Sequence, residues 1–419
     1  MSPVSRVFAS FTETWPRRST VTRLTLALVI AAGVGIMPAP ASSTNIARAS
    51  TQKTDPEIML IEVYKELGAN HLRKAQQKAD ALVAAYPNFR LGHLIRGDLL
   101  LMHTRPVGTL GAGVNGPAEN LQNLREEAMV RMRSLRERPD PNLVPRLILQ
   151  LRDDQKHVLL VDAKRSRLYV YENRQGQLKF AKDFYISQGK LGVHKFKEGD
   201  QKTPIGIYYI TGRLPGARLP DFYGVGALPI NYPNEWDKLH GRSGSGIWLH
   251  GTPSEIFSRP PLSSDGCVVL TNPDLHKLSA SVEVGKTPIV ISENIEFVSK
   301  ATWNSERNVA AKLVDDWRRD AESLNAAALM ANYSPRFRSE LGEDLATWFP
   351  KHHQLFSSVK KLAVKMRDVS SFFYPGRDDL IVNTFTQDAF VGGRKASVRK
   401  RQYWIKEGAQ WKVLYEINI

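Results

Sequence analysis

Apolar positions follow three different spacings along the chain, and each spacing predicts a different kind of region. Residues 55–150 carry apolar side chains at roughly helical intervals, which predicts a helical N-terminal region. Residues 156–299 show short β-branched and aromatic runs between Gly- and Pro-bearing loops, which predicts a β-rich domain with one helix near Asp274–Ala280. Residues 303–419 begin with one apolar helical stripe and continue as strand-like runs, which predicts an α+β domain. The patterns therefore predict a multidomain chain.

Finer expectations follow within these regions. The interval between Ala75 and Pro87 is that of a tetratricopeptide repeat, but a plain helical hairpin is favoured because the Gly and Tyr positions of such a unit are missing. The runs HVLLVD and RLYVYEN predict a β-hairpin that opens the central domain. A helix is expected over Ser305–Tyr333, followed by strands at LAVKMRDV, LIVNTFTQDAF, VRKRQYWI and WKVLYEI.

The N-terminus has the pattern of an export signal. Four arginines lie within residues 1–23, and the uncharged segment Leu24–Ala39 is short for a membrane span. Ala39-Pro40-Ala41 offers a small-x-small cleavage site, so residues 1–41 are predicted to be a signal peptide and residues 42–54 a polar spacer. An uncleaved anchor remains the alternative, in which case the signal segment is the only contact with the membrane. We expect an exported protein of the periplasm or cell envelope.

Composition narrows the class of partner. The 419 residues are 42% hydrophobic and 24% charged, which is ordinary for globular domains and excludes a disordered chain. The net charge of +16 favours nucleic acid, an anionic membrane or an acidic polymer as the neighbour. Motifs that read bases are missing from the sequence, and export argues against nucleic acid. An anionic envelope therefore suits the charge best.

Cys267 is the only cysteine of the sequence, so an intramolecular disulfide is impossible. An exported protein retains a lone thiol either as an inert buried group or for its reactivity. An apolar strand delivers His250 upstream of Cys267, and an imidazole within hydrogen-bonding reach is what a thiol needs to become a nucleophile at neutral pH. Gly266 would let the backbone amides of Gly266 and Cys267 approach a developing oxyanion. These residues predict a cysteine-dependent acyl transfer.

The same stretch resembles the L,D-transpeptidase catalytic family, also called the YkuD family, whose mark is HGT followed by S-x-G-C. Here the motif is His250-Gly251-Thr252 and Ser264-Asp265-Gly266-Cys267, an S-D-G-C form. Upstream, VLLVDAKRSRLYVYEN, ISQGK and Thr203-Pro204-Ile205-Gly206 resemble the family's opening strands and its TP-x-G element. The resemblance covers residues 156–293.

The resemblance implies a role for each motif residue. Cys267 would form a thioester with a peptidoglycan stem peptide, His250 would be its base, and the carbonyl of Gly251 would orient the imidazole. Ser264, Asp265 and Gly266 would support the turn or the oxyanion. Thiolate, imidazole and backbone amides suffice for this chemistry, so we expect no metal and no organic cofactor.

Two departures from the family pattern concern the substrate. Many members have His where this chain has Asp265, and Arg where it has Val269, which leaves the substrate carboxylate without its expected partner. Arg242 or Arg259 is a candidate for the missing cation, with a solvated surface arginine as the alternative for each. His240 is a candidate for the substrate groove. His352-His353 lacks the further ligands of a metal site.

The C-terminal region resembles the nuclear-transport-factor-like or ketosteroid-isomerase-like cone fold of SnoaL-type domains. Such a fold encloses a pocket, so it would bind a peptide or a glycan, or pair with another subunit. A helical region, a catalytic centre of this kind and such a tail also occur together in cell-shape L,D-carboxypeptidases.

The resulting hypothesis is an exported peptidoglycan L,D-transpeptidase that crosslinks stem peptides or attaches an envelope lipoprotein. One alternative is an L,D-carboxypeptidase or hydrolase of the same bond, which would affect cell shape or release lipoprotein. An alternative of another class is a non-catalytic wall-binding scaffold. The sequence leaves the acceptor and the oligomeric state open.

Overall fold

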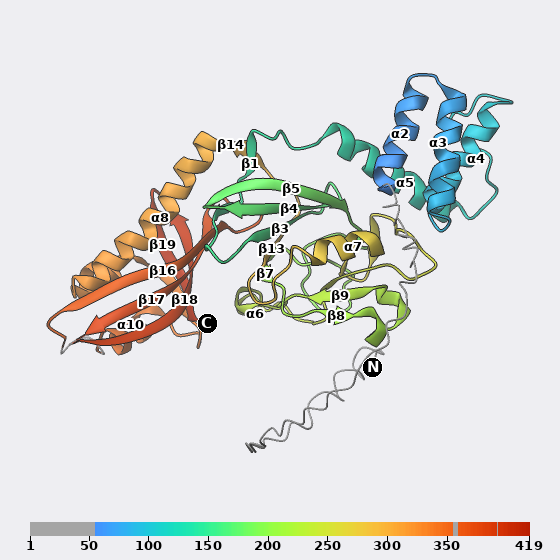
Figure 1. Ribbon diagram of the computed structural model, residues 1–419. Coiled ribbons are helices and arrows are strands. Elements are labelled where there is room, and N and C mark those ends of the chain that lie inside the picture. Colours follow the sequence, from blue (N-terminus) through green and yellow to red (C-terminus); the bar gives the residue numbers. More distant parts are fainter. Residues whose placement is uncertain (1–54, 355–358, 392) are drawn as a thin grey trace, which may run out of the picture. The chain divides into compact units, whose positions relative to one another are not determined.

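The computed structural model describes residues 55–354, 359–391 and 393–419 (Figure 1). The described residues belong to one compact unit, Lys53–Ile419. The predicted signal peptide and spacer lie outside the described residues. Within the described ranges, the structure has no helix that combines the length and the apolar character of a membrane span.

The N-terminal region is helical because each helix has one apolar face and these faces meet in a shared core around Leu60, Ala79, Phe89 and Ile95. Asp55 caps the first helix by accepting a hydrogen bond from the amide of Glu57 at 2.9 Å. The helices of this region are α2 (Pro56–Gly68), α3 (Leu72–Ala85), α4 (Arg90–Met102) and α5 (Ala118–Arg136).

The helices end earlier than the predicted 55–150 range. Beyond Arg136, the chain forms β1 (Leu143–Pro145) and β2 (Ile148–Gln150). β1 pairs with a strand at the end of the central domain, and β2 joins the edge of the C-terminal sheet. The physical reason is the short apolar run Leu147–Leu149, which is too short for a helix but gains full burial as an edge strand, with Ile148 and Leu149 both inaccessible to solvent.

The central domain is β-rich, as predicted. A five-stranded sheet in the order β5-β4-β3-β13-β7 and a four-stranded sheet in the order β12-β10-β9-β8 share one apolar core. The predicted hairpin is β3 with β4, and the predicted helix is α7. The strands are β3 (His157–Asp162), β4 (Arg167–Arg174), β5 (Gln177–Tyr185), β6 (Gln188–Gly189), β7 (Gly206–Tyr209), β8 (Leu214–Pro215), β9 (Gly226–Pro229), β10 (Trp248–His250), β11 (Leu262–Ser264), β12 (Val268–Val269), β13 (Pro288–Ser292) and β14 (Phe297–Ser299). The helices are η1 (Gly216–Arg218), η2 (Asp221–Tyr223), α6 (Glu235–Leu239) and α7 (Asn272–Ser279).

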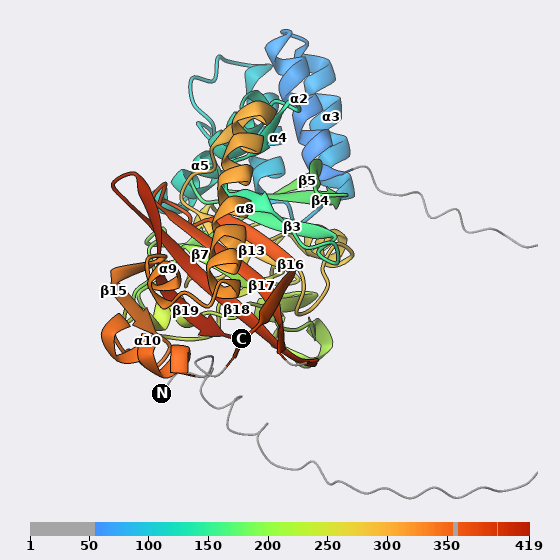
Figure 2. The same ribbon diagram turned by 90° about the vertical axis from the view of Figure 1, so that its left-hand side faces the viewer.

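The C-terminal domain places a long helix against a six-stranded sheet in the order β15-β19-β18-β17-β16-β2 (Figure 2). The predicted strands are all present, but the predicted helix Ser305–Tyr333 is interrupted. It ends at Glu322 and resumes at Ala326, because Leu324 adopts a left-handed backbone with φ 60° that a helix cannot contain. The elements are α8 (Lys300–Glu322), α9 (Ala326–Met330), β15 (Tyr333–Ser339), α10 (Leu345–Gln354), β16 (Leu362–Phe373), β17 (Leu380–Val391), β18 (Arg394–Glu407) and β19 (Gln410–Asn418).

Candidate active site

Strand pairing brings His250 and Cys267 to the same side of the small sheet. β10 and β12 run parallel, with Leu249 opposite Val268 and both buried in the core. Because successive side chains of a strand point to opposite faces, His250 and the residue that precedes β12, Cys267, both point away from that core. Two residues separated by a long loop in the sequence are thereby placed on one surface.

The imidazole of His250 is held in the tautomer that a base requires. Its Nδ1 lies 2.7 Å from the carbonyl oxygen of Gly251, so Nδ1 carries the hydrogen and Nε2 keeps its lone pair. Nε2 is buried and has no hydrogen-bond partner among the described residues. Burial lowers the pKa of His250 to about 4, so the ring is neutral at physiological pH.

Aromatic rings enclose this imidazole. The ring centroid of Tyr223 lies 5.1 Å from that of His250 and 4.9 Å from that of Trp248, and Phe222 lies 5.6 Å from His250. Burial, together with the negative charge of an ionised Cys267, raises the pKa of Tyr223. These rings exclude water from the base, which explains its low pKa.

Cys267 is a protonated thiol in the free protein. Burial raises its pKa to about 11, against a hydrogen bond from the backbone of Trp248 and the charge of Arg259, which both lower it. Its Sγ lies 3.4 Å from the carbonyl oxygen of Gly246, to which the thiol donates. The thiol and the imidazole are thus both neutral in the free protein.

The turn before Cys267 has a fixed shape. The hydroxyl of Ser264 donates to the carbonyl of Cys267 at 2.6 Å and accepts from the amide of Gly266 at 3.1 Å. Gly266 has φ 126°, and a Cβ there would lie 2.7 Å from the carbonyl oxygen of Lys202, so only glycine fits. The amide of Gly266 is thus used inside the turn, unlike the oxyanion role that the sequence suggested for it.

The other motifs of the sequence meet at this turn. Thr203 donates through its hydroxyl to the carbonyl of Gly266 at 3.0 Å, and the same hydroxyl accepts from the amide of Gly189 at 3.0 Å. The TP-x-G element and the ISQGK segment therefore support the catalytic turn directly.

Asn272 is a site residue that the sequence analysis missed. Its side-chain oxygen accepts from the amides of Val225 and Thr252, and its amide nitrogen donates to the carbonyl of Thr252 at 2.8 Å. A Cβ on Gly251 would lie only 2.1 Å from that side-chain oxygen, which explains the glycine of the HGT motif. The signal was an asparagine followed by proline at a helix start, a pattern too common to single out.

The candidate substrate-binding residues separate into two groups. Arg259 lies at the catalytic pair, where its charge lowers the pKa values of His250 and Cys267. Arg242 instead donates to Asp237 at 2.8 Å and to Tyr374 of the C-terminal domain at 3.1 Å.

Two further candidates, His240 and Asp265, are both exposed but have different neighbours. His240 packs on the ring of Trp236, with 4.3 Å between centroids, and its Nδ1 lies 2.8 Å from the Trp236 carbonyl. The side chain of Asp265 is 70% exposed and accepts from Gln201 at 3.0 Å. His240 therefore belongs to the packing around α6, whereas Asp265 lies at the surface beside the catalytic turn.

The described part of the chain holds no cluster of three or more His, Cys, Asp or Glu residues that could bind a metal ion.

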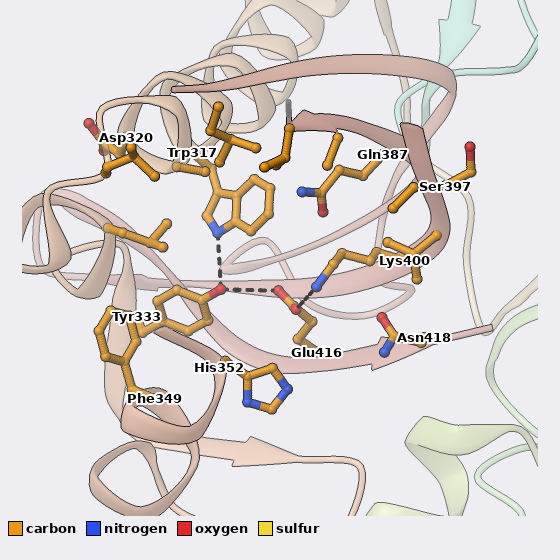
Figure 3. Close-up of a pocket in the computed structure, with 18 of the residues that line it drawn as sticks. Trp317, Asp320, Tyr333, Phe349, His352, Gln387, Ser397, Lys400, Glu416 and Asn418 are labelled. Carbon is orange, nitrogen blue, oxygen red and sulfur yellow. Dashed lines mark hydrogen bonds and ion pairs between the residues drawn. The ribbon is translucent and has the colours of Figure 1, made fainter. Parts of the chain in front are cut away.

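The C-terminal domain has a cavity of its own, about 560 Å³ in volume (Figure 3). Trp317 donates to the hydroxyl of Tyr333 at 3.1 Å, and that hydroxyl donates to Glu416 at 3.2 Å. Glu416 also pairs with Lys400. A mostly aromatic and aliphatic lining with a few convergent polar groups is typical of a small-ligand site.

The structure thus combines a buried imidazole and a thiol on the same side of a sheet, on a β-rich scaffold followed by an α+β domain, an arrangement that suits cysteine-dependent acyl transfer. Residues 156–291 match the L,D-transpeptidase catalytic domain (YkuD), and residues 309–417 match the Cds6 C-terminal NTF2-like domain. The chain thus contains a YkuD L,D-transpeptidase catalytic domain followed by an NTF2-like domain, which confirms the predicted fold class.

Individual relatives agree with these domains. The Escherichia coli K12 protein YafK, whose name places it with the L,D-transpeptidases, is 30% identical over 111 residues, which are 26% of this chain and 40% of YafK. Bd1075 of Bdellovibrio bacteriovorus is 28% identical, with a TM-score of 0.58 over 66% of this chain and 98% of its own. The helical cell shape determining protein Pgp2 of Campylobacter jejuni shares the fold at 23% identity, with a TM-score of 0.56 over 68% of this chain and 97% of its own. The matched segment spans less than half the length of YafK.

Proposed function

We propose that this protein is an exported, cysteine-dependent L,D-transpeptidase that acts on peptidoglycan stem peptides through a thioester on Cys267. The observation that carries the proposal is the free, neutral Nε2 of His250 on the same side of the sheet as the thiol. A base whose Nε2 has no partner among the described residues is available for the proton of Cys267.

The chemistry follows from this arrangement. The thiol proton moves to Nε2 of His250 as Sγ attacks the carbonyl carbon at the L-centre of the stem. The amide of Cys267 donates to the oxyanion, because the amide of Gly266 is already engaged by Ser264. His250 then returns its proton to the departing amine of the terminal D-amino acid, and a thioester remains. An acceptor attacks this thioester, loses a proton to His250, and releases the thiol.

The acceptor decides the product. The amine of a second stem gives a crosslink, a lipoprotein lysine gives attachment, and water gives an L,D-carboxypeptidase or a hydrolase that releases lipoprotein. Pgp2, which shares the fold, is a cell shape determining protein by name, and an effect on cell shape is what we expect of the hydrolytic alternative. We place the reaction in the periplasm or cell envelope, in keeping with the predicted signal peptide and the positive net charge.

A non-catalytic wall-binding scaffold is the competing class. It would have no use for a buried imidazole that keeps a free Nε2, nor for a turn in which Ser264 and Thr203 hold the residue before Cys267. The preserved geometry therefore favours the enzyme.

The experiment is mass spectrometry of muropeptides, free and lipoprotein-linked, incubated with reduced mature protein and with Cys267→Ala. New crosslinks, shortened stems or released lipoprotein, seen only with the intact thiol, would establish the enzyme and identify its acceptor. Binding to peptidoglycan by both proteins with no product from either would establish the scaffold instead.

A further inference from the structure

Arg259 lies in the loop that joins His250 to the catalytic turn, and its side chain has an unused donor. Its Nη2 donates to the carbonyl of Ser263, and its guanidinium lies 5.4 Å from the ring centroid of Phe222. Nη1 is buried and has no hydrogen-bond partner among the described residues. Burial of a guanidinium nitrogen without an acceptor lowers the free energy of unfolding, so the buried Nη1 of Arg259 needs an explanation.

Three other cations of the catalytic domain are already neutralised. Lys195, whose charge also acts on Cys267, pairs with Asp200 at 2.8 Å. Lys190 lies 3.6 Å from Asp265. Arg242 is paired with the buried Asp237. Unlike these three side chains, Arg259 combines a contact with Phe222, whose ring lies 5.6 Å from that of His250, with a buried donor that has no acceptor among the described residues.

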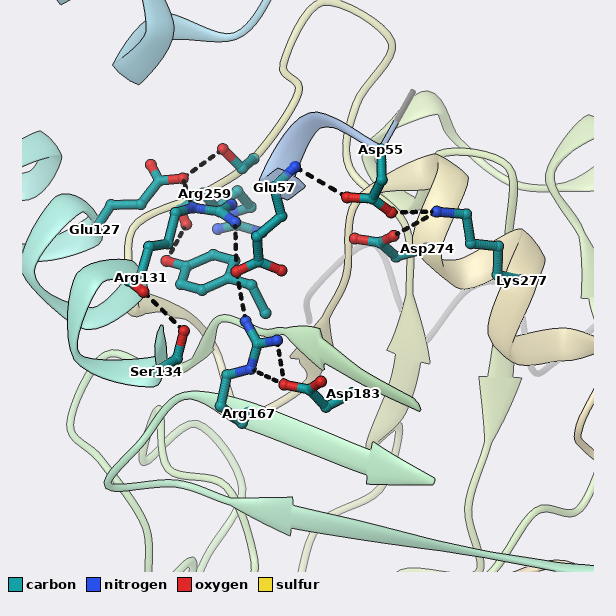
Figure 4. A network of polar contacts seen from close by, with 12 residues as sticks. Asp55, Glu57, Glu127, Arg131, Ser134, Arg167, Asp183, Arg259, Asp274 and Lys277 are labelled. Carbon is teal, nitrogen blue, oxygen red and sulfur yellow. Dashed lines mark hydrogen bonds and ion pairs between the residues drawn. The ribbon is translucent and has the colours of Figure 1, made fainter. Parts of the chain in front are cut away.

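The backbone of Arg259 is held firmly in place. Its carbonyl oxygen accepts from the hydroxyl of Tyr185 at 2.8 Å and from the hydroxyl of Ser187 at 2.9 Å. The preceding residue, Ser258, donates to Glu127 of α5 at 2.7 Å, within the polar network that joins α5 to the catalytic domain (Figure 4). A backbone fixed in this way restricts the positions that the Arg259 side chain can adopt, which lowers the entropic cost of binding a ligand there.

We propose that Arg259 binds the terminal carboxylate of the stem peptide, and so makes the enzyme select stems whose C-terminus is a free carboxylate. The inference rests on the proposed function. The guanidinium lies 5.4 Å from the ring centroid of Phe222, and that ring lies 5.6 Å from the ring of His250, so the cation lies on the side of the base that faces Phe222. The terminal carboxylate is separated from the attacked carbonyl by a single residue, so a cation in this position can hold it. Nη1, together with the second hydrogen of Nη2, matches the two oxygens of a carboxylate.

The test compares two stem tetrapeptides that differ only at the C-terminus, one with a free carboxylate and one with a carboxamide. The wild type is expected to prefer the free carboxylate by roughly ten- to a hundredfold in kcat/KM, the range of a charge-assisted hydrogen bond. Arg259→Gln should bring this ratio close to one, and any further change in turnover that follows from the lost charge beside His250 and Cys267 should be the same for both substrates. Arg259→Lys should recover part of the preference, and Arg174→Gln, at an exposed arginine paired with Glu172, should keep the wild-type ratio.

Three outcomes would overturn the assignment. An unchanged ratio in Arg259→Gln would show that the arginine does not read the terminus. An equal loss on both substrates would make Arg259 a support for the thiol alone. A ratio that responds instead to amidation of the side-chain carboxylate of the stem's diamino acid would move the contact to that group.

A binding measurement separates this inference from the proposed function. Calorimetry with Cys267→Ala and with Cys267→Ala/Arg259→Gln, on the same two peptides, needs no turnover. Preference for the free carboxylate that disappears in the double variant would support the role of Arg259 even if the wild type formed no product. Equal binding of both peptides to Cys267→Ala would overturn it.

Discussion

His250 shows how one buried residue couples catalysis to stability. The residue is 1% exposed, and burial depresses the pKa of the folded imidazole to about 4, from 6.5 in an exposed histidine. Between pH 4 and pH 6.5, the imidazole of His250 binds a proton in the unfolded chain but not in the folded protein. The free energy of unfolding must therefore fall as the pH is lowered through this interval.

Replacement of His250 by Gln should remove most of that acid sensitivity. Relative to His250→Gln, the wild type is expected to lose on the order of 3 kcal/mol between pH 6.5 and pH 4, as estimated from the depressed pKa. Urea unfolding at several pH values measures the difference. Parallel pH profiles for the two proteins would show that the imidazole has the same pKa in the folded and unfolded states, against the depressed value.

The proposed catalytic pair can be singled out from the sequence, whereas its surroundings cannot. His250 and Cys267 follow from the motif and its spacing, because a thiol nucleophile needs an imidazole. Tyr223 and Asn272 approach them only after the loop before β9 and the start of α7 fold onto β10. These contacts depend on tertiary packing, which local patterns do not encode.

The loop between β10 and β11 contacts the helical region and leads from there to the active site. Phe257 packs on Phe89 and Tyr86, with ring centroids 4.7 Å and 5.2 Å apart, inside the core of the helical region. Its amide donates to the carbonyl of Asn88 at 3.4 Å. The helical region thus holds a segment that lies only two residues from Arg259.

Tyr185 should act as a positioning residue for this loop. Its ring lies under the guanidinium of Arg131 of α5, at 3.9 Å, and its hydroxyl supports the carbonyl of Arg259. In Tyr185→Phe we expect the preference for a free terminal carboxylate to fall about three- to tenfold, the worth of one hydrogen bond, with turnover of the amidated stem almost unchanged.

The matched control for Tyr185→Phe is Tyr171→Phe, a buried tyrosine of β4 that packs on Phe180 at 5.7 Å between ring centroids. It should keep the wild-type substrate preference. If Tyr185→Phe lowered turnover of both stems equally, together with the thermal midpoint, the hydroxyl would be a structural group without a role in specificity.

Element boundaries were the least predictable part of the fold. Strands β16 to β19 follow from alternating β-branched and aromatic residues, and the structure confirms them. The break at Leu324 and the strand β2 were missed, because the first depends on one residue's positive φ and the second on a sheet edge far away in the chain. The local periodicity of the sequence shows neither the break at Leu324 nor the strand β2.

At the scale of the whole molecule, the catalytic and C-terminal domains share buried contacts. Tyr374 of the C-terminal domain donates to the carbonyl of Ile205 at 3.2 Å, inside the TP-x-G element. Trp236 of α6 stacks on Tyr403, with ring centroids 4.3 Å apart. Next to this stack, Arg401 of β18 pairs with Glu235 at 2.5 Å. We expect the two domains to unfold together.

Removal of the charges of the Glu235–Arg401 pair tests this coupling. Both side chains are largely buried, at 17% and 8% exposure, and although burial alone would raise the pKa of Glu235, Arg401 holds it below its usual value. Glu235→Gln leaves a buried arginine without its counter-charge and is expected to cost about 3–5 kcal/mol of the free energy of unfolding.

The double variant Glu235→Gln/Arg401→Met should recover part of that loss, because it removes the unpaired charge together with its partner. Urea unfolding of the wild type, Glu235→Gln, Arg401→Met and the double variant, followed by the fluorescence of the tryptophans in both domains, gives the four free energies of the cycle. If the two substitutions were simply additive, the pair would contribute nothing to the contact. If Glu235→Gln showed separate transitions for the two domains where the wild type shows one, the pair would link the unfolding of the two domains. The TP-x-G element, which supports the turn before Cys267, would then depend on the C-terminal domain for its own support.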